Sequence, residues 1–282
     1  MIDLHVHSTY SDGTLSPEEL IRLAEQTGLK AAALCDHNTV AGLPAFLKVA
    51  ANSSVEAIPG IEFSTDYLGT ELHVLGLFVE PEHYDAVMEK VNSMLVLKEK
   101  SNRDLVETLK GAGMDLDYEA IKAGTPNGQI NRAVIAAEMV RKGYCPTVKD
   151  CFSLWLSPKR GYYKPPARLD VFEVISFIKS IGAVAVLAHP FLNLDEAGLR
   201  GFLKEAVPCG LDAMETLYPK FSPEQRQLAC RIAEEFDLRI SGGSDFHGEN
   251  KPDIQLGTGR GDLAVPDSLL QELKNKKYFN EK

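Results

Sequence analysis

Two pairs of side chains that can bind metals stand close to the two ends of the sequence. His5 and His7 are separated by one residue, and so are Asp245 and His247. Alternate side chains of a β-strand point to the same face, so each pair would present both of its groups to one side. Imidazole nitrogens and carboxylate oxygens are ligands that Mn²⁺, Zn²⁺ and Fe²⁺ accept in proteins. The spacing therefore indicates a metal site built on strand ends.

Further histidines and carboxylates fall at the ends of expected strands, and one acid lies in a polar loop that can return over the first strand. The complete set of expected ligands is His5, His7, Asp12, His37, Glu62, His73, His189, Asp245 and His247. This set includes six of the seven histidines and leaves out His83. So many nitrogen and oxygen ligands exceed what one ion requires, and we expect two or three ions that share bridging carboxylates. Such a centre activates water near neutral pH, which makes hydrolysis the leading class of reaction.

Short apolar runs that alternate with helical patterns must position these groups. The seven expected strands are Ile2–His7, Ala31–His37, Glu56–Thr65, Glu71–Phe78, Ala183–Pro190, Leu211–Tyr218 and Leu238–His247. Helices with clear start signals lie between them, since Ser16 and Ser222 each precede a proline and a capping-box glutamate or glutamine. The alternation predicts an α/β fold with a mostly parallel sheet, in which reactive groups gather at the carboxyl edge.

The alternation stops for a long stretch between the fourth and fifth strands. Residues 81–180 read as several helices together with a segment rich in glycine and proline at 157–166. We expect a barrel made of residues 1–98 and 166–282, and a helical insertion at residues 99–165. Insertions of this size commonly form lids or substrate walls, so the insertion should contribute contacts to the substrate.

The composition is that of an acidic globular protein. The 282 residues include 40 acidic and 30 basic side chains, and the formal net charge of −10 disfavours binding to duplex nucleic acid. No apolar stretch approaches the roughly 20 residues that cross a bilayer, and Met1–His7 is unlike a signal peptide. We therefore expect a cytoplasmic protein without membrane contact. The five cysteines form no Cys-x-x-Cys pair and are expected to be isolated packed thiols, neither disulfides nor metal ligands.

The motifs that contain the expected ligands occur in a fixed order along the chain. They are Asp3-Leu4-His5-Val6-His7-Ser8 with Ser11-Asp12-Gly13, Cys35-Asp36-His37-Asn38-Thr39, Pro59-Gly60-Ile61-Glu62, His73-Val74-Leu75-Gly76, Ala188-His189-Pro190 and Gly243-Ser244-Asp245-Phe246-His247. Together they resemble the polymerase and histidinol phosphatase (PHP) family. The resemblance implies a distorted seven-stranded (β/α) barrel, in agreement with the strands counted above. It also implies a metal-dependent phosphatase or phosphodiesterase, most similar to members that act as nucleoside 3′,5′-bisphosphate phosphatases or 5′-to-3′ exoribonucleases.

The resemblance divides the nine ligands among three divalent ions, with Mn²⁺ expected and Zn²⁺ or Fe²⁺ as alternatives. His5, His7, Glu62 and Asp245 would hold the first ion, Glu62, His73 and His189 the second, and Asp12, His37 and His247 the third. Glu62 would then bridge two ions. A hydroxide that bridges metal ions would be the nucleophile, and Asp12, Glu62 and His247 are expected to take part in catalysis.

The insertion is expected to bind the substrate through Arg132, Tyr163 and Lys164. Arg132 matches the arginine of a Gly-Arg-Pro-His-like segment in the family, whereas Asn131 and Val134 replace its glycine and histidine. Arg132 and Lys164 could hold a second phosphate, and Tyr163 could stack on a base. The expected substrate is a nucleoside 3′,5′-bisphosphate or monophosphate, or short RNA with a 5′-phosphate.

Three other functions stay open at this point. The first is a histidinol-phosphate-type phosphatase. An amidohydrolase barrel also begins with His-x-His, but it commonly bridges its metals with a modified lysine, and Glu62 takes the bridging position here. A non-catalytic nucleotide-binding module would lack some ligands, and none is missing.

Three further acids are expected to play supporting parts around the ligands. Asp3 would orient an imidazole or cap a turn, Asp36 would fix a loop, and Glu215 could stand behind a metal-binding histidine.

Overall fold

The computed structural model describes residues 1–125, 130–166 and 168–279, and the chain forms two compact units. The first unit combines Met1–Lys90 with Leu169–Lys282, and the second unit is Val91–Arg168. The second unit is wider at both ends than the insertion expected at residues 99–165. Its first boundary falls inside the long helix α3 (Tyr84–Gly111), where no change of pattern marks it in the sequence.

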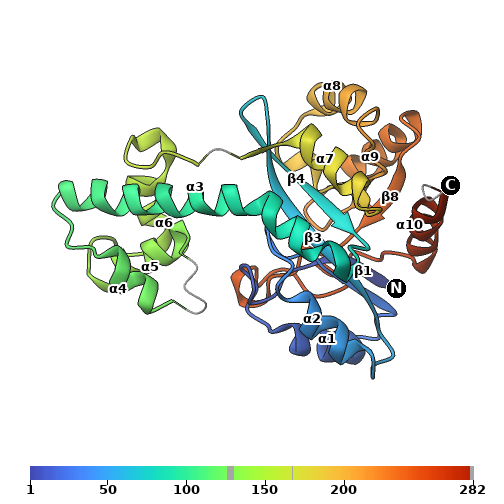
Figure 1. Ribbon diagram of the computed structural model, residues 1–282, viewed down its shortest axis with the longest axis horizontal. Coiled ribbons are helices and arrows are strands. Elements are labelled where there is room, and N and C mark those ends of the chain that lie inside the picture. The colour runs from blue at the N-terminus through green and yellow to red at the C-terminus, as the bar shows by residue number, and fades with distance from the viewer. Residues whose placement is uncertain (126–129, 167, 280–282) are drawn as a thin grey trace. The chain divides into compact units, whose positions relative to one another are not determined.

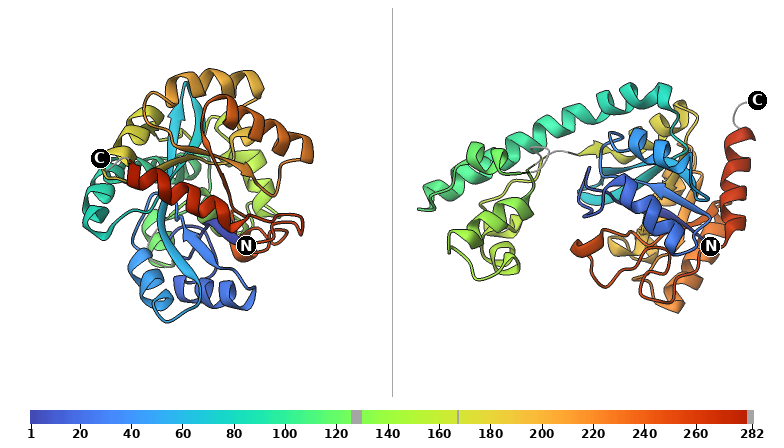
Figure 2. Two further views of the ribbon diagram at one scale, coloured as in Figure 1. Left: turned by 90° about the vertical axis from the view of Figure 1, so that its right-hand side faces the viewer. Right: turned by 90° about the horizontal axis from the view of Figure 1, so that it is seen from below.

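A curled sheet forms the centre of the first unit (Figure 1 and Figure 2). Its strands are β1 (Ile2–Val6), β2 (Ala31–Leu34), β3 (Glu56–Tyr67), β4 (Thr70–Leu77), β5 (Leu169–Asp170), β6 (Val184–Leu187), β7 (Ala213–Leu217) and β8 (Arg239–Gly242). Their order is β1-β2-β3-β4-β6-β7-β8, and β5 pairs with β3. A bridge between Val6 and Phe246 joins the end of β1 to the segment after β8. The predicted α/β fold is confirmed, with all seven expected strands; β5 is an addition too short to show a pattern in the sequence.

One strand runs against its neighbours and decides where the ligands meet. β4 is antiparallel to β3 and to β6, whereas the other pairs are parallel. The carboxyl ends of the parallel strands therefore share one edge, and β4 reaches that edge with its amino end, where His73 lies opposite Ser64. The expectation that Glu62 lies near the end of its strand is wrong, because β3 continues to Tyr67 in a hairpin with β4. The pairing of β3 with β2 ends at Pro59, which leaves Glu62 at the ligand edge.

Helices surround the sheet, as Figure 2 shows. They are α1 (Pro17–Gln26), α2 (Leu43–Ala50), the first part of α3, α7 (Val171–Ser180), α8 (Glu196–Ala206), α9 (Pro223–Glu235) and α10 (Asp267–Phe279). Short 3₁₀ turns occupy Pro81–His83, Pro190–Leu192 and Gly248–Asn250. Both predicted capping boxes are present, with Ser16 and Glu19 at the start of α1 and Ser222 and Gln225 at the start of α9.

The edge of the sheet opposite the ligands is closed by α10. Leu269, Leu270 and Leu273 of this helix join the buried apolar side chains inside the sheet. Asp267 pairs with the terminal amino group of Met1, and Lys274 pairs with Glu56 at the start of β3. Because each buried side chain of leucine size contributes about 1.5–3 kcal/mol, this end of the unit is a packed core rather than a second opening.

The second unit is helical around its own apolar core. It contains the last part of α3, α4 (Tyr118–Ala123), α5 (Arg132–Arg141), α6 (Val148–Cys151), a π-helical turn at Phe152–Leu156 and a 3₁₀ turn at Pro158–Arg160. Leu105 and Leu109 of α3 belong to the same buried cluster as Ile135 and Met139 of α5. The predicted helical content is present, and its use as a lid or substrate wall stays a prediction.

The expectation of isolated thiols is wrong for two of the five cysteines. Cys145 and Cys151 form a disulfide within the second unit, with their Cα atoms 5.6 Å apart. The side chain of Thr147 caps the short helix α6, whose single turn returns the chain from Cys145 to Cys151. A separation of six residues matches no common disulfide or metal motif. The sequence therefore does not predict the pairing, which depends on the turn of α6. The remaining cysteines, Cys35, Cys209 and Cys230, carry free thiols.

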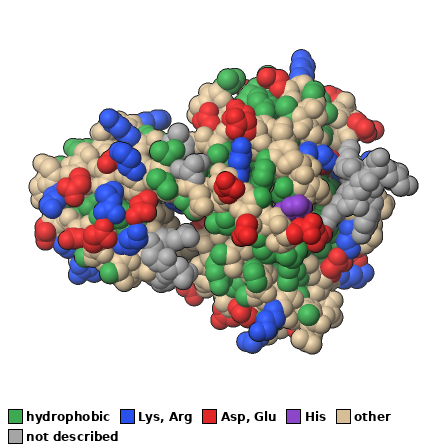
Figure 3. Space-filling model, viewed as in Figure 1, with side chains coloured by type: hydrophobic (Ala, Val, Ile, Leu, Met, Phe, Trp, Pro, Cys, Tyr) green, Lys and Arg blue, Asp and Glu red, His purple; other side chains and the backbone are tan. Residues whose placement is uncertain are grey.

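None of the helices in the described ranges combines the length and the apolarity of a membrane span. The face drawn in Figure 3 carries acidic and basic side chains intermixed, and little histidine is visible on it. The side chains of the six predicted histidine ligands range from 0% exposed at His5 to 23% exposed at His37. The cytoplasmic location stays a prediction.

Candidate metal centre

Glu62 lies at the centre of the predicted ligands, and its side chain is fully buried. Its Oε1 atom is 2.7 Å from Nδ1 of His73 and 3.0 Å from Nε2 of His189. Its Oε2 atom lies 3.1–3.2 Å from one ring nitrogen of each of three further histidines, His5, His7 and His37. One carboxylate therefore contacts five imidazoles, which come from β1, β4 and the segments after β1, β2 and β6.

The other two acids extend the cluster toward solvent. Oδ1 of Asp245 is 3.4 Å from Nε2 of His7 and 3.4 Å from Nδ1 of His247. The side chain of Asp12 is 42% exposed, and it places Oδ1 3.3 Å from Nε2 of His247 and Oδ2 3.8 Å from Nε2 of His37. The structure thus brings all nine predicted ligands into one continuous cluster.

Three groups of these side chains have ligand atoms close enough to share an ion, within 4.8 Å of one another. The groups are His7, Asp12, His37 and His247; His5, His7 and Asp245; and His37, Glu62 and His73. This grouping differs from the division that the family resemblance implies, because His7 and His37 each belong to two groups. His83, the seventh histidine, lies instead beside Glu82, 3.6 Å from its carboxylate.

Several buried atoms of the cluster are placed to bind a cation. Among the described residues, Oδ1 of Asp12, Nδ1 of His37 and Oε2 of Glu62 are buried and make no well-directed hydrogen bond. The Nε2 atoms of His5 and His7 face each other at 3.0 Å, and each is 3.2 Å from Oε2 of Glu62. Buried polar atoms are normally satisfied, and converging nitrogen and oxygen lone pairs suit a divalent cation. The residues therefore fit the metal ions that the resemblance implies.

Burial and charge shift the pKa values of the cluster in opposite directions. Burial alone would lower the pKa of His73, but the Glu62 carboxylate raises it to about 10. Burial acts in the same way on His7, where the carboxylates of Asp245 and Glu62, at 3.4 and 3.2 Å from its Nε2, raise the pKa to about 9. At His37, burial and the charges of neighbouring histidines prevail and lower the pKa to about 3. In the metal-free protein, protons on some histidines thus balance the buried acids, and metal binding must displace those protons.

Asp36 anchors the loop that carries Asp12. Its carboxylate accepts hydrogen bonds from the backbone N–H of Ser8 at 2.7 Å, from the Ser8 hydroxyl at 2.6 Å and from the Ser11 hydroxyl at 2.6 Å. Gly13 closes the loop so near the carbonyl of His7 that a Cβ atom at this glycine would overlap it. Asp36 therefore has the loop-fixing role expected of it.

Asp3 ties the segment after β8 to β1. Its fully buried carboxylate accepts hydrogen bonds from the backbone N–H of Ser244 at 2.9 Å, from the Ser244 hydroxyl at 2.5 Å and from the N–H of Gly257 at 2.8 Å. Burial raises the pKa of Asp3, although these hydrogen bonds act against the shift. Gly243 approaches β1 so closely that a Cβ atom there would lie 2.5 Å from Cβ of His5. Two roles are expected of Asp3, either to orient an imidazole or to cap a turn. Its hydrogen bonds to backbone N–H groups agree with the second role.

Glu215 stands behind two of the histidines. Its carboxylate lies 3.0 Å from Nδ1 of His5 and accepts a hydrogen bond from the backbone N–H of His189 at 2.7 Å. A carboxylate oxygen beside Nδ1 of His5 favours the tautomer in which Nδ1 carries the proton and Nε2 directs its lone pair into the cluster. The carbonyl oxygen of Asp245 fixes His247 in the same way, at 2.8 Å from its Nδ1.

Two residues that the sequence did not indicate hold the second oxygen of Asp245. The hydroxyl of Tyr218 donates to Oδ2 at 2.8 Å, and the ammonium of Lys251 donates to it at 2.7 Å. Burial would raise the pKa of Asp245, but a hydrogen bond from His7 and nearby positive charges, including Lys251, lower it well below its ordinary value. Tyr218 ends an expected strand and could have been noticed, whereas Lys251 lies six residues beyond Asp245 in no motif.

Two of the cluster residues have a left-handed backbone. The φ angle is 55° at Asp245 and 28° at His189. This region is costly for residues other than glycine, and aspartate and asparagine tolerate it best. The N–H of Asp245 is bonded to the carbonyl of His5 at 2.9 Å, and His189 is followed by Pro190, so the surrounding chain holds both residues in place.

The three predicted substrate contacts lie in the second unit. The guanidinium of Arg132 lies 4.5 Å from the ring centre of Tyr163 and 5.5 Å from that of Phe152, and it donates to the carbonyl of Leu156 at 3.4 Å. Tyr163 is only 8% exposed, and little of its ring is free to stack on a base. Lys164 is exposed, as a contact to a phosphate requires.

Asn131, at the position of the family's glycine, has a structural role. Its side chain accepts a hydrogen bond from the backbone N–H of Val134 at 3.0 Å and so caps the start of α5. The replacement therefore fixes the helix that begins with Arg132. The side chain of Val134 has no polar atom, so it cannot make the polar contact that the family's histidine could make.

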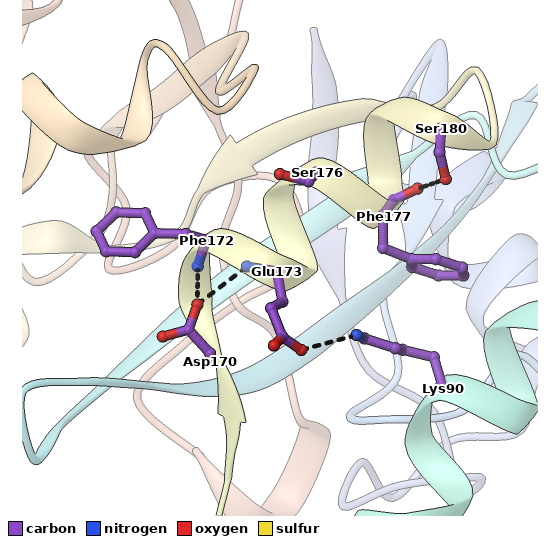
Figure 4. A pocket seen from close by; sticks show the side chains of 7 residues that line it. All are labelled: Lys90, Asp170, Phe172, Glu173, Ser176, Phe177 and Ser180. Carbon is purple, nitrogen blue, oxygen red and sulfur yellow. Dashed lines mark hydrogen bonds and ion pairs between the residues drawn. The ribbon is translucent and has the colours of Figure 1, made fainter.

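A shallow surface depression lies along α7, away from the cluster (Figure 4). Lys90 reaches across it to Glu173 at 3.1 Å, and Asp170 caps the helix through the N–H groups of Phe172 and Glu173. Its three charged side chains, Lys90, Asp170 and Glu173, therefore already have partners. None of the nine predicted ligands lines it.

A curled α/β sheet with six histidines and three acids at one edge defines a metal-dependent hydrolase. The PHP domain family matches residues 3–155 of this chain. The chain belongs to the PHP family, and its enzymatic class is that of the metal-dependent phosphoesterases.

Curated relatives and a solved structure agree with this assignment. The chain is similar to a 5′-3′ exoribonuclease of Haemophilus influenzae, with 34% identity over 87% of this chain and 89% of the relative. It is 30% identical to a phosphoribosyl 1,2-cyclic phosphate 1,2-diphosphodiesterase of Eggerthella lenta, over 88% of this chain and 94% of the relative. A 3′,5′-nucleoside bisphosphate phosphatase of Chromobacterium violaceum is 26% identical over 90% of each chain. A structure from Bifidobacterium adolescentis, assigned to the metal-dependent phosphoesterases, has a TM-score of 0.82 and 27% identity, covering 98% of this chain and 96% of that one.

Proposed function

We propose that the protein hydrolyses phosphate esters of nucleotides, either a nucleoside 3′,5′-bisphosphate or monophosphate or the 5′ end of short RNA. The observation that carries the proposal is the buried carboxylate of Glu62, which meets five imidazoles at 2.7–3.2 Å. The relatives named as an exoribonuclease and as a nucleoside bisphosphate phosphatase support the class of substrate.

We infer three divalent ions, with Mn²⁺ as the expected metal and Zn²⁺ or Fe²⁺ as alternatives. His5, His7, Glu62 and Asp245 would hold the first, Glu62, His73 and His189 the second, and Asp12, His37 and His247 the third. The contacts of both Glu62 oxygens support a bridging role, and the grouping of His7, Asp12, His37 and His247 supports the third site. When bound, such ions activate water and neutralise charge on phosphate oxygens.

The protein's own residues would then orient the reaction. Asp12 has the most exposed side chain of the nine, so the substrate would approach from its side of the cluster. Asp12 and His247 are 3.3 Å apart and are placed to hold or move a proton at the reacting oxygens. Glu62 contributes by fixing the positions of the imidazoles around it.

In the second unit, Arg132 and Lys164 would bind a second phosphate of the substrate. The contact between Arg132 and Tyr163 supports a revised role for the tyrosine, which holds the guanidinium in position. Base stacking on Tyr163 would require the arginine to move away from the ring.

A substrate panel tests the proposal directly. The metal-free protein is supplied with Mn²⁺ and assayed on adenosine 3′,5′-bisphosphate, nucleoside monophosphates, histidinol phosphate and 5′-phosphorylated oligoribonucleotides. Release of phosphate or of mononucleotides from a nucleotide substrate is the expected result. Activity on histidinol phosphate alone would assign the protein to that alternative, and silence on every phosphate ester would refute the proposal.

A second candidate is a cyclic phosphodiesterase, favoured by the 30% identity to the enzyme of Eggerthella lenta. The same metal centre would open the cyclic ester. Adding phosphoribosyl 1,2-cyclic phosphate to the panel separates the two, because a preference for this substrate over the bisphosphate would replace the first candidate.

A further inference from the structure

The two oxygens of Asp245 have different surroundings. Oδ1 faces the ligand cluster, at 3.4 Å from nitrogens of His7 and His247 and 3.9 Å from Nε2 of His5. Oδ2 points the other way and accepts hydrogen bonds from the Tyr218 hydroxyl and the Lys251 ammonium. With both of these partners in place, only Oδ1 is free to bind an ion.

Lys251 is held in this position by the turn that precedes it. Its backbone N–H donates to the carbonyl of Gly248 at 3.1 Å, which closes the 3₁₀ turn Gly248–Asn250. The side chain of Asn250 donates to the carbonyl of Asp12 at 2.8 Å, so the turn is also tied to the loop of another predicted ligand. The Lys251 side chain is 28% exposed and Asp245 only 6%, so the ion pair is largely shielded from solvent.

We propose that Lys251 is a positioning residue that acts through Asp245: it confines the carboxylate to a single bond through Oδ1 and lowers the affinity of the ion held there. The inference rests on the proposed metal centre. In the metal-free protein the same ammonium partly balances the buried acids.

The direction of the effect follows from charge. The ammonium and the divalent ion would share one carboxylate, and two positive groups on opposite oxygens repel each other with little screening at a buried site. The ammonium also draws electron density from the carboxylate, which weakens the bond through Oδ1. Removal of the charge should therefore tighten metal binding while it destabilises the metal-free protein. A purely structural lysine would behave otherwise, because its loss would weaken both.

The test compares Lys251→Met with the wild type and with Lys251→Arg, using the full chain after removal of metal. Free Mn²⁺ is followed by electron paramagnetic resonance during titration, and the melting temperature of the metal-free protein is measured. In Lys251→Met we expect half-occupancy at about ten-fold lower free Mn²⁺ and a lower melting temperature. Lys251→Arg keeps the charge and should match the wild type in both measurements. Lys48→Met, at an exposed lysine of α2, controls for the change in net charge.

Weaker or unchanged Mn²⁺ binding by Lys251→Met, with the wild type binding normally, would overturn this inference and leave the proposed function standing. Failure of the wild type to bind Mn²⁺ would overturn both. If Lys251→Met does not fold, Lys251→Gln replaces it, since the amide can still donate a hydrogen bond but carries no charge. The same tightening is expected there, and its absence would count against the proposal equally.

Discussion

Five imidazoles converge on the two oxygens of Glu62, and this contact distinguishes the cluster from a set of separately packed histidines. An isolated buried carboxylate would be costly, and here the surrounding histidines lower its pKa well below the ordinary value against the effect of burial. The ionised form of Glu62, which is the form that binds metal ions, is thereby favoured.

Replacement of Glu62 by glutamine should remove the shared carboxylate and keep its shape. Since loss of even an outer partner of a metal ligand costs about 10–100-fold in affinity or activity, we expect Glu62→Gln to lose roughly 100-fold or more in activity. Metal content after dialysis, measured by mass spectrometry, should fall by more than one ion per chain. Glu82→Gln, at an exposed acid, is the matched control. Unchanged metal content in Glu62→Gln would refute the bridging role.

Metal binding should depend on pH in a defined direction. The pKa values of His7 and His73 are raised to about 9 and about 10, above the value near 6.5 of an unfolded chain. Stability from these protonated groups is fully present below about pH 6.5 and is lost as the pH rises through 9–10. Mn²⁺ must displace their protons, so its affinity should rise between about pH 7 and pH 9 with release of protons. Calorimetric titration in two buffers of different ionisation enthalpy measures the release; an affinity independent of pH over this range would contradict the assignment.

At the scale of the element, the loops rather than the strands set the precision of the centre. Strand alternation and strand ends, together with the polar loop of Asp12, suffice to predict that the nine side chains gather, because parallel strands bring their carboxyl ends to one edge. They do not predict Lys251 or Tyr218, whose contacts depend on how the chain turns after β7 and β8. The antiparallel course of β4 is equally hidden, although His73 reaches the cluster only because of it.

Loss of the loop anchor Asp36 should release the segment that carries Asp12. Asp36→Asn leaves three short hydrogen bonds weakened or unpaired, at a cost of about 1–3 kcal/mol in the free energy of unfolding. We expect one metal ion to be lost and the others to be retained, as metal analysis would show. Asp66→Asn, which alters a similar bond to Gly69 at the tip of the β3–β4 hairpin, should leave the metal content unchanged. Equal metal content in both variants would argue against the anchor role.

The close approach of the segment after β8 to β1 permits no side chain at Gly243. A methyl group would meet Cβ and the backbone nitrogen of His5 at 2.5–2.6 Å, so Gly243→Ala should cost about 1–3 kcal/mol through forced displacement. Gly201→Ala, inside α8 with open space around it, should instead stabilise by about 0.5–1 kcal/mol. Urea unfolding of the two variants measures both values, and similar results for the two would contradict the packing.

At the scale of the whole molecule, two units are stabilised by different means. Metal ions would serve the first unit, whereas the Cys145–Cys151 disulfide, worth about 2 kcal/mol for so short a loop, serves the second. The first unit could be outlined from strands and motifs. The boundary within α3 and the disulfide could not, because the helix is continuous across the boundary and a separation of six residues between cysteines matches no common motif.

Chelation and reduction should therefore act on separate parts of the chain. Removal of metal should increase hydrogen exchange in the segments around Asp12, His37 and Asp245 and leave residues 91–125 unchanged. A reductant should do the reverse, with faster exchange around α6. Hydrogen exchange followed by mass spectrometry resolves the two regions, and parallel changes in both after chelation alone would show that the units do not unfold independently.

The left-handed backbone of Asp245 restricts how this position can evolve. Aspartate, asparagine and glycine fit the φ angle of 55° with little penalty, whereas branched or bulky residues do not. In a lineage that no longer needed the ion, selection on the carboxylate would vanish while selection on the turn remained. Substitutions at position 245 should then be mainly to asparagine or glycine. Relatives that had lost catalysis would therefore keep the backbone conformation of the site without its carboxylate.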